Sequence, residues 1–243
     1  MSLQIRAFGQ TDVGQVRRRN EDTLAVEPPR GIVVVADGMG GAPAGDLASS
    51  LAVQEVTKGL QAGEGMEESV LRANRKILEA TLGQPALSGM GSTVTALKVS
   101  LEELTYLVGH VGDSRAYLLS DERFSQISRD HTMVRDMVDA GKIPASAERE
   151  HPLGHILNRV LGTEKTVAVD LVEGGVREGD CFLLCSDGLV KVMEDRELER
   201  WAREARSRPL ERVVGAMVEE ANRRGAPDNV TVAFLVVAEG SQS

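Results

Sequence analysis

The sequence predicts a mixed fold in which short β-strands alternate with amphipathic helices. Apolar runs rich in valine and isoleucine, bounded by glycine or polar residues, are typical of strands. Other segments carry apolar residues at helical spacing, most clearly near the C-terminus. This alternation excludes an all-helical fold, but periodicity does not show how the strands pair.

The strand predictions follow the apolar runs along the chain. The run 31–36, with the sequence GIVVVA, has no polar side chain and predicts a buried strand. The other expected strands are 3–8, 23–27, 92–99, 104–111, 115–119, 167–172, 180–185 and 229–237. No internal repeat or low-complexity linker divides these elements, so we expect one domain over residues 1–240.

The helix predictions rest on stripes of apolar residues. One stripe runs from Leu47 to Leu60, and a second lies within 66–82. Pro209 suits the first turn of a third helix, whose stripe runs to Ala221 and which ends before Gly225. The segment 129–160 is polar and irregular, with a helix expected near 132–140.

Charge and composition narrow the classes of partner. The 243 residues include 28 basic and 37 acidic side chains, a net charge of −9, which argues against general nucleic-acid binding. Cys181 and Cys185 have neither redox-pair nor zinc-ligand spacing, so we expect two buried free thiols. With no signal-like N-terminus and no membrane-spanning apolar run, we expect a cytoplasmic protein or the cytoplasmic part of a larger one, without a membrane partner.

Carboxylates recur where expected strands meet loops, mostly beside glycine. They are Glu21 and Asp22 in NEDTL, Asp37 in VVVADGMGG, Asp113 in GHVGDSR, Asp187 in LLCSDGL and Asp228 in APDNVTV. For any one of them, a turn or a helix cap is the favoured interpretation. Together they predict a cluster, and clustered carboxylates repel one another unless a cation neutralises them.

Oxygen ligands without histidine or cysteine favour Mg²⁺ or Mn²⁺ over zinc. Two such ions, about 3.5–4 Å apart, can activate a water molecule for in-line attack on phosphorus. Arg17, four residues before Glu21, is a candidate clamp for the phosphate group. The pattern therefore indicates metal-dependent hydrolysis of phosphate esters.

The chain resembles the bacterial branch of the protein phosphatase 2C family of metal-dependent serine/threonine protein phosphatases. The matching pieces occur in family order between about residues 9 and 237: GQVRRRNEDTL, VVVADGMGG, GMGSTVTAL, GHVGDSRAYLL, SRDHT, LLCSDGL and GAPDNVTV. The resemblance implies an α+β fold, a four-layer αββα sandwich of two antiparallel β-sheets flanked by helices. It also implies a flap at about 133–158 that lies beside the site and influences substrate choice.

The resemblance implies a role for each acid. Asp37 would bridge two metal ions, Mn²⁺ or Mg²⁺. The Gly38 carbonyl and, through water, Glu21 would serve one ion, while Asp187 and Asp228 would hold the other. Asp113 would bind a third, weaker ion. Arg17 would bind phosphate, and Asp22 and Asn229 would orient ligands and waters.

One departure from the family pattern concerns the proton donor. Many bacterial members have a histidine after the double glycine, and animal members have one directly after Asp-Gly. Here Met39 and Ala42 occupy those places, so no general acid is identified. A metal-bound water or His131 could fill the role, and we expect His151 and His155 to be solvated.

We therefore expect hydrolysis of phosphoserine and phosphothreonine in proteins by a metal-activated water, without a phosphoenzyme. The protein would be a monomer in bacterial signalling, acting on phosphoprotein substrates of a serine/threonine kinase. One alternative is a phosphatase for other phosphomonoesters, which a substrate panel would distinguish. The other is a non-catalytic pseudophosphatase that binds phosphoproteins, and the missing histidine leaves that alternative open.

Overall fold

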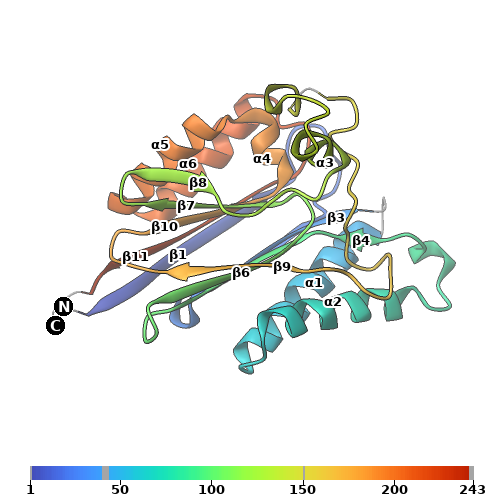
Figure 1. Ribbon diagram of the computed structural model, residues 1–243, viewed down its shortest axis with the longest axis horizontal. Coiled ribbons are helices and arrows are strands. Elements are labelled where there is room, and N and C mark those ends of the chain that lie inside the picture. The colour runs from blue at the N-terminus through green and yellow to red at the C-terminus, as the bar shows by residue number, and fades with distance from the viewer. Residues whose placement is uncertain (1, 40–43, 150, 241–243) are drawn as a thin grey trace.

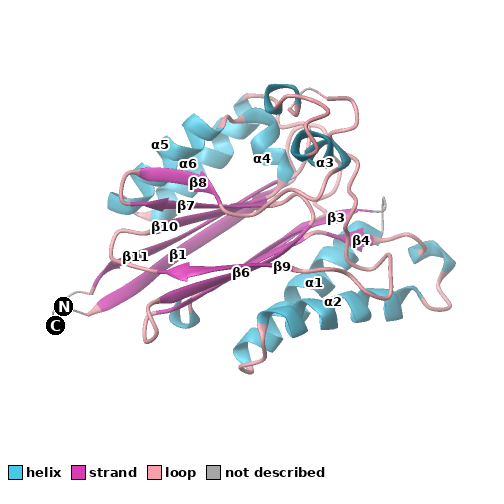
Figure 2. Cartoon of the chain, in the orientation of Figure 1, coloured by secondary structure: helices cyan, strands magenta, loops and turns pink. Residues whose placement is uncertain are grey.

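Two antiparallel β-sheets lie face to face, and helices cover both outer faces (Figure 1, Figure 2). This computed structural model describes residues 2–39, 44–149 and 151–240. The expected four-layer αββα sandwich is confirmed. No helix in the described ranges has the length and apolar composition needed to cross a membrane.

The first sheet has the strand order β1-β11-β10-β7-β8. Its strands are β1 (Leu3–Asp12), β7 (Arg115–Ser120), β8 (Arg123–Gln126), β10 (Cys181–Cys185) and β11 (Val230–Glu239). The long strands β1, at the edge of the sheet, and β11 are in register from Leu3 opposite Glu239 to Asp12 opposite Val230. Helices α5 (Asp195–Ser207) and α6 (Leu210–Arg223) cover its outer face, and the short α4 (Asp187–Val192) follows β10.

The second sheet has the order β2-β3-β5-β6-β9, with the short β4 also paired to β3. Its strands are β2 (Asp22–Glu27), β3 (Ile32–Met39), β4 (Gly91–Ser92), β5 (Val94–Ser100), β6 (Thr105–Val111) and β9 (Asp170–Gly175). Helices α1 (Ala44–Gln61) and α2 (Met66–Thr81) cover its outer face. Helix α3 (Met133–Asp139) and three short 3₁₀ helices, Pro28–Arg30, Pro85–Leu87 and Ala145–Ala147, complete the described elements.

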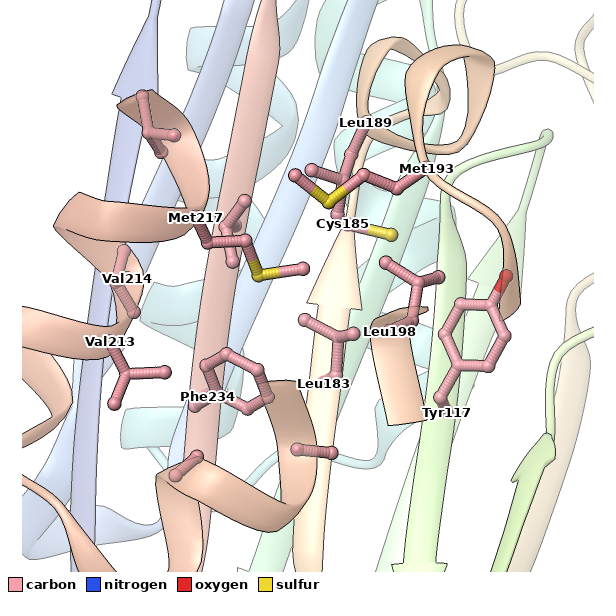
Figure 3. Packing of buried hydrophobic residues seen from close by; sticks show 14 of the residues in the cluster. Tyr117, Leu183, Cys185, Leu189, Met193, Leu198, Val213, Val214, Met217 and Phe234 are labelled. Carbon is pink, nitrogen blue, oxygen red and sulfur yellow. The ribbon is translucent and has the colours of Figure 1, made fainter. Parts of the chain in front are cut away.

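Strand β3 is apolar from Ile32 to Ala36 because both faces of this part are buried. Val33 and Val35 pack into the core between the two sheets. Ile32, Val34 and Ala36 face the opposite way and pack against α1 and α2. A third cluster lies between the first sheet and α5 and α6, where Figure 3 shows Leu183 and Phe234 facing side chains of those helices. The strand end that carries Asp37 is thus anchored from both sides.

Most of the expected elements are present. All the predicted strands are found, although 167–172 begins later, at Asp170, and extends to Gly175. The four predicted helices correspond to α1, α2, α3 and α6. Strand β8 and helices α4 and α5 were not predicted from the sequence. Cys181 and Cys185 are buried and unpaired as expected, and burial raises the pKa of each thiol to about 12.

Candidate active site and metal-binding residues

The acids identified in the sequence meet at one end of the sandwich, where β3, α4 and the segment containing α3 approach one another (Figure 1). A cavity of about 280 Å³ lies there. Its lining includes Arg17, Glu21, Asp37, Gly38, Asp113, Asp187, Asp228 and Asn229. The structure therefore brings together every predicted site residue with a described position except Asp22, which lies behind the cavity wall.

Asp37 is held by the backbone at the end of β3. Its N–H donates to Thr93 Oγ1 at 2.9 Å, and its carbonyl accepts from the Thr93 N–H at 2.9 Å and from Ser92 Oγ at 3.1 Å. Burial, followed by repulsion from neighbouring aspartates led by Asp22, raises the pKa of Asp37 well above its usual value. A rigidly placed carboxylate that resists ionisation favours a nearby cation.

Glycine is required here for close approach of the backbone. A Cβ at Gly38 would lie 2.0 Å from the carbonyl oxygen of Gly45 in α1. A Cβ at Gly45 would lie 2.7 Å from the Glu21 carboxyl carbon. The two glycines therefore let β3, α1 and the segment that carries Glu21 converge at the cavity.

Asp22 sits directly opposite Asp37 in the β2–β3 pair. Its Oδ2 accepts hydrogen bonds from Ser186 Oγ at 2.7 Å and Thr231 Oγ1 at 2.6 Å, while its buried Oδ1 has no hydrogen-bond partner. Burial is the main reason that the pKa of Asp22 rises to about 7. Asp22 thus connects the second sheet to the strand ends that carry Asp187 and Asp228.

Asn229 connects three backbone segments and is only 4% exposed. Its Oδ1 accepts from the Glu21 N–H at 2.8 Å, and its Nδ2 donates to the carbonyls of Val13 and Arg19, both at 2.9 Å. These bonds fix the loop that carries Arg17 and Glu21 beside the start of β11.

Asp113 enters the cavity from the connection between β6 and β7, where the chain passes from one sheet to the other. The preceding Gly112 has φ of +110°, and a Cβ there would lie 2.5 Å from the Thr93 side chain. Burial, then repulsion from Asp187 and Asp130, raises the pKa of Asp113 to about 8, although Lys191 acts in the opposite direction. Asp113 is therefore another acid that an added cation would stabilise.

Asp187 and Asp228 differ from the other acids because basic side chains contact them. Asp187 begins α4, and its Oδ2 lies 2.6 Å from Lys191 Nζ, while its buried Oδ1 has no hydrogen-bond partner. Asp228 Oδ2 lies 2.8 Å from the same ammonium, and Asp228 Oδ1 lies 2.8 Å from Arg17 Nε. Burial alone would raise the pKa of Asp228, but the ion pairs with Lys191 and Arg17 lower it.

Two titratable residues of the cavity, Lys191 and His155, were not anticipated. Lys191 was not identified because α4, which places it one turn after Asp187, was not predicted. His155 was expected to be solvated; it is exposed, but it lines the cavity together with Leu157. The position of Lys191, four residues after Asp187, was the available signal for its contact with Asp187. No feature of the sequence indicated that His155 lines the cavity.

The family model for protein phosphatase 2C matches residues 15–230. The chain belongs to the protein phosphatase 2C family.

Relatives and solved structures in this family are similar over nearly the whole chain. The serine/threonine phosphatase Stp of Listeria monocytogenes is 34% identical over 238 residues, covering 93% of each chain. The protein phosphatase PstP of Mycobacterium tuberculosis is 34% identical over 246 residues, which span 98% of this chain and 46% of PstP. A crystal structure of PstP superposes with a TM-score of 0.88 at 32% identity, covering 97% of this chain and all (100%) of that one.

A second PstP structure, its catalytic domain in complex with two manganese ions, has a TM-score of 0.87 at 32% identity. The match covers 98% of this chain and 100% of that one. The architecture of this protein phosphatase 2C chain is therefore that of the solved family members.

The acids of this protein phosphatase 2C chain fit divalent cations by their chemistry. Asp22, Asp37 and Asp113 all have raised pKa values, chiefly because of burial and then, in part, because the acids repel one another. The free Oδ1 of Asp187 is a buried acceptor without a donor. In the described ranges, however, no three histidine, cysteine or acidic side chains are already arranged around a common point. Lys191 and Arg17 instead occupy oxygens of Asp187 and Asp228.

The contacts of His131 do not favour it as the proton donor. Its Nδ1 accepts from the Gly112 N–H at 3.0 Å, so its Nε2 carries the proton and donates to Asp170 Oδ2 at 3.0 Å. Both ring nitrogens are engaged, and the side chain does not line the cavity. These contacts instead give His131 a structural role beside α3 and β9. Ala42, where relatives have histidine, lies outside the described residues.

Proposed function

We propose that the protein hydrolyses phosphoserine and phosphothreonine in other proteins, with two divalent ions, Mn²⁺ or Mg²⁺, bound at the acid cluster. The observation that carries the proposal is the convergence of Glu21, Asp37, Asp113, Asp187 and Asp228 on one cavity that also holds Arg17. Membership of the protein phosphatase 2C family supports it, as do the two manganese ions named for the PstP catalytic domain.

The proposed ligand set follows the positions around the cavity. Asp37 would serve both ions; the Gly38 carbonyl and, through water, Glu21 would serve the first, and Asp187 and Asp228 the second. Asp113 would serve a third, weaker ion. When bound, the ions would stabilise charge on the phosphoryl group and lower the pKa of a water molecule for in-line attack.

The side chains of the protein itself position the substrate. Arg17 is 50% exposed at the cavity and presents a planar guanidinium suited to bidentate contact with phosphate. Asp22 and Asn229 hold the acid-bearing segments in place from behind. Once Arg17 turns from Asp228 to the phosphate, a charge-assisted contact orients the phosphorus toward Asp37.

A second, larger cavity of about 840 Å³ shares Asp113, Asp187, Lys191 and His155 with the first. One wall is formed by residues of the proposed flap, namely Ala145, Glu148, Arg149, His151, Gly154 and His155. Another is formed by residues of α4, the start of α5 and the turn between them, namely Val190, Lys191, Met193, Glu194, Asp195 and Arg196. We assign this cavity to the peptide that flanks the phosphorylated residue. Its position would allow the flap, at about 133–158, to influence substrate choice.

We further propose that residues 1–240 form one catalytic domain that acts in bacterial signalling, opposite a serine/threonine kinase. The bacterial origin and the names of the relatives support this role. The expectations of a cytoplasmic location and of a monomer remain proposals on the sequence alone.

The decisive experiment is phosphate release from a phosphothreonine peptide at millimolar Mn²⁺, with EDTA as the metal-free control. We expect turnover that EDTA and Asp37→Asn each abolish. Asp121→Asn is the matched control, because it removes an equal charge from the exposed β7–β8 turn. A panel of small phosphomonoesters, run in parallel, separates a protein phosphatase from a general one. Mn²⁺ binding without turnover of any substrate would indicate a pseudophosphatase instead.

A further inference from the structure

Lys191 contacts both of the carboxylates that are proposed to bind one of the two ions. Its Nζ lies 2.6 Å from Asp187 Oδ2 and 2.8 Å from Asp228 Oδ2. Arg17 contacts Asp228 only, so in the described chain Lys191 is the basic side chain that bridges the two acids proposed to share one ion. The ammonium and the ion would therefore use the same oxygens.

Local structure holds Lys191 in this position. Asp187 and Lys191 are separated by four residues in α4, so their side chains lie on the same face of that helix. Gly188 packs against the backbone of β11, where a Cβ would lie 1.9 Å from the Asn229 carbonyl oxygen. This close packing places α4, and with it Lys191, directly beside Asp228.

We propose that Lys191 is a built-in competitor of the divalent ion: the ion binds Asp187 and Asp228 by displacing the ammonium, and this exchange lowers metal affinity. The inference rests on the proposed metal-dependent function, because it concerns ligands of that site. It assigns to Lys191 a regulatory role in metal binding and no contact with the reacting atoms.

The charges determine the direction of the exchange. At equal distance, the Coulomb attraction of a divalent ion for a carboxylate is twice that of an ammonium, which favours displacement of Lys191 by the ion. The ion must still break two existing contacts, and its affinity is lower for that reason. The free Oδ1 of Asp187 gives the ion a first point of attachment before Lys191 leaves.

The larger cavity can accept the Lys191 side chain once the ion has displaced it. The Lys191 side chain is 38% exposed and lines both the acid cavity and the larger cavity beside it. Its long flexible stem allows the ammonium to move from Asp187 and Asp228 into the larger cavity without movement of α4.

The test measures metal binding by the full chain with Mn²⁺ alone. Calorimetric titration of Lys191→Met should give an Mn²⁺ dissociation constant about tenfold lower than that of the wild type. Arg196→Met is the matched control, because it removes an equal charge from the wall of the larger cavity. It should change the dissociation constant less than about twofold.

The effect of metal on thermal stability provides a second readout. A lysine with a purely structural role would contribute the same stability with and without metal. Without metal, Lys191→Met should unfold at a lower temperature than the wild type, because Asp187 and Asp228 lose their shared partner. In saturating Mn²⁺ the difference should close or reverse. Lys191→Gln, which keeps a polar side chain, should behave in the same way and serves if the methionine variant does not fold.

Equal Mn²⁺ affinities for wild type and both Lys191 variants would overturn the inference, as would an equal loss of thermal stability with and without metal. The proposed phosphatase function can be refuted independently of this inference. If the affinity shift is present but no phosphopeptide is hydrolysed, the competitor role stands and the phosphatase assignment is wrong. A wild type that binds no Mn²⁺ would overturn both.

Discussion

Replacing Asn229 with alanine should loosen the loop that carries Arg17 and Glu21 while leaving every charged group of the site in place. The side chain is 4% exposed and makes hydrogen bonds to Glu21, Val13 and Arg19. Alanine at this position retains the backbone of β11 and its pairing with β1. The variant therefore isolates the connection between the loop and the sheet.

The expected loss of stability follows from the number of hydrogen bonds that the substitution removes. Each buried hydrogen bond contributes about 1 kcal/mol net, so the loss of all three should lower the free energy of unfolding by about 3 kcal/mol. For a chain of this size, 1 kcal/mol corresponds to roughly 2–4 °C in Tm, so we expect a decrease of roughly 6–12 °C. KM for a phosphothreonine peptide should rise about tenfold, because Arg17 is no longer held in position.

The assay combines thermal unfolding with steady-state kinetics at saturating Mn²⁺. Asn222→Ala is the matched control, since the Asn222 side chain makes a single hydrogen bond, to Asp12 at 3.1 Å, and neither of these residues lines the cavity. Its Tm should fall by about one third as much, with KM unchanged. If Asn229→Ala is no less stable than Asn222→Ala, or if its KM equals the wild-type value, the proposed role of Asn229 is wrong.

Three further predictions address the charged groups and the missing histidine. Arg17→Ala should raise KM for phosphopeptide about tenfold or more and also tighten Mn²⁺ binding, because Asp228 loses a competing cation; unchanged kinetics would remove Arg17 from the phosphate site. The pKa of Asp113 is raised from 3.8 to about 8, so the folded, metal-free protein holds a proton that the unfolded chain has lost. The free energy of unfolding of the protein in EDTA should therefore fall as the pH rises from 6.5 to 8, a window above the range in which the buried histidines titrate. If Asp113→Asn shows the same slope as the wild type, Asp113 is not the cause of this pH dependence. Ala42→His should raise kcat for a phosphothreonine peptide more than for p-nitrophenyl phosphate, since only the poor leaving group needs a proton, and equal effects on the two substrates would refute it.

The sequence by itself determined the elements whose side chains follow a clear period. The stripe of α6 and the apolar run of β3 are local patterns, and both elements are present as expected. Helix α5 was missed because only Leu198, Ala202 and Ala205 are buried along its 13 residues, so charged side chains dominate the pattern. Strand β8, with the sequence RFSQ, lies at the edge of its sheet and has no fully buried residue. Such elements depend on packing against neighbours that local sequence does not reveal.

The sequence also identified the acids that line the cavity, because each is placed at a strand end. Their convergence was decided by the tertiary structure. The antiparallel pairing of β10 with β11 brings the end of β10 beside the start of β11, and so Asp187 beside Asp228. The pairing of β2 with β3 puts Asp22 opposite Asp37, and the face-to-face packing of the sheets joins the two pairs.

Only the tertiary structure shows which basic side chains contact the acids. Arg17 and Lys191 are far apart in sequence, yet both contact Asp228. Lys191 reaches Asp187 because α4 turns the chain through one helical turn, and it reaches Asp228 because α4 packs on β11 without an intervening side chain at Gly188. Periodicity in a sequence reports which face of an element is buried, whereas contacts between distant elements are set by strand register and by backbone packing. For that reason the cluster of carboxylates could be predicted here, but the ion pairs that Arg17 and Lys191 make with it could not.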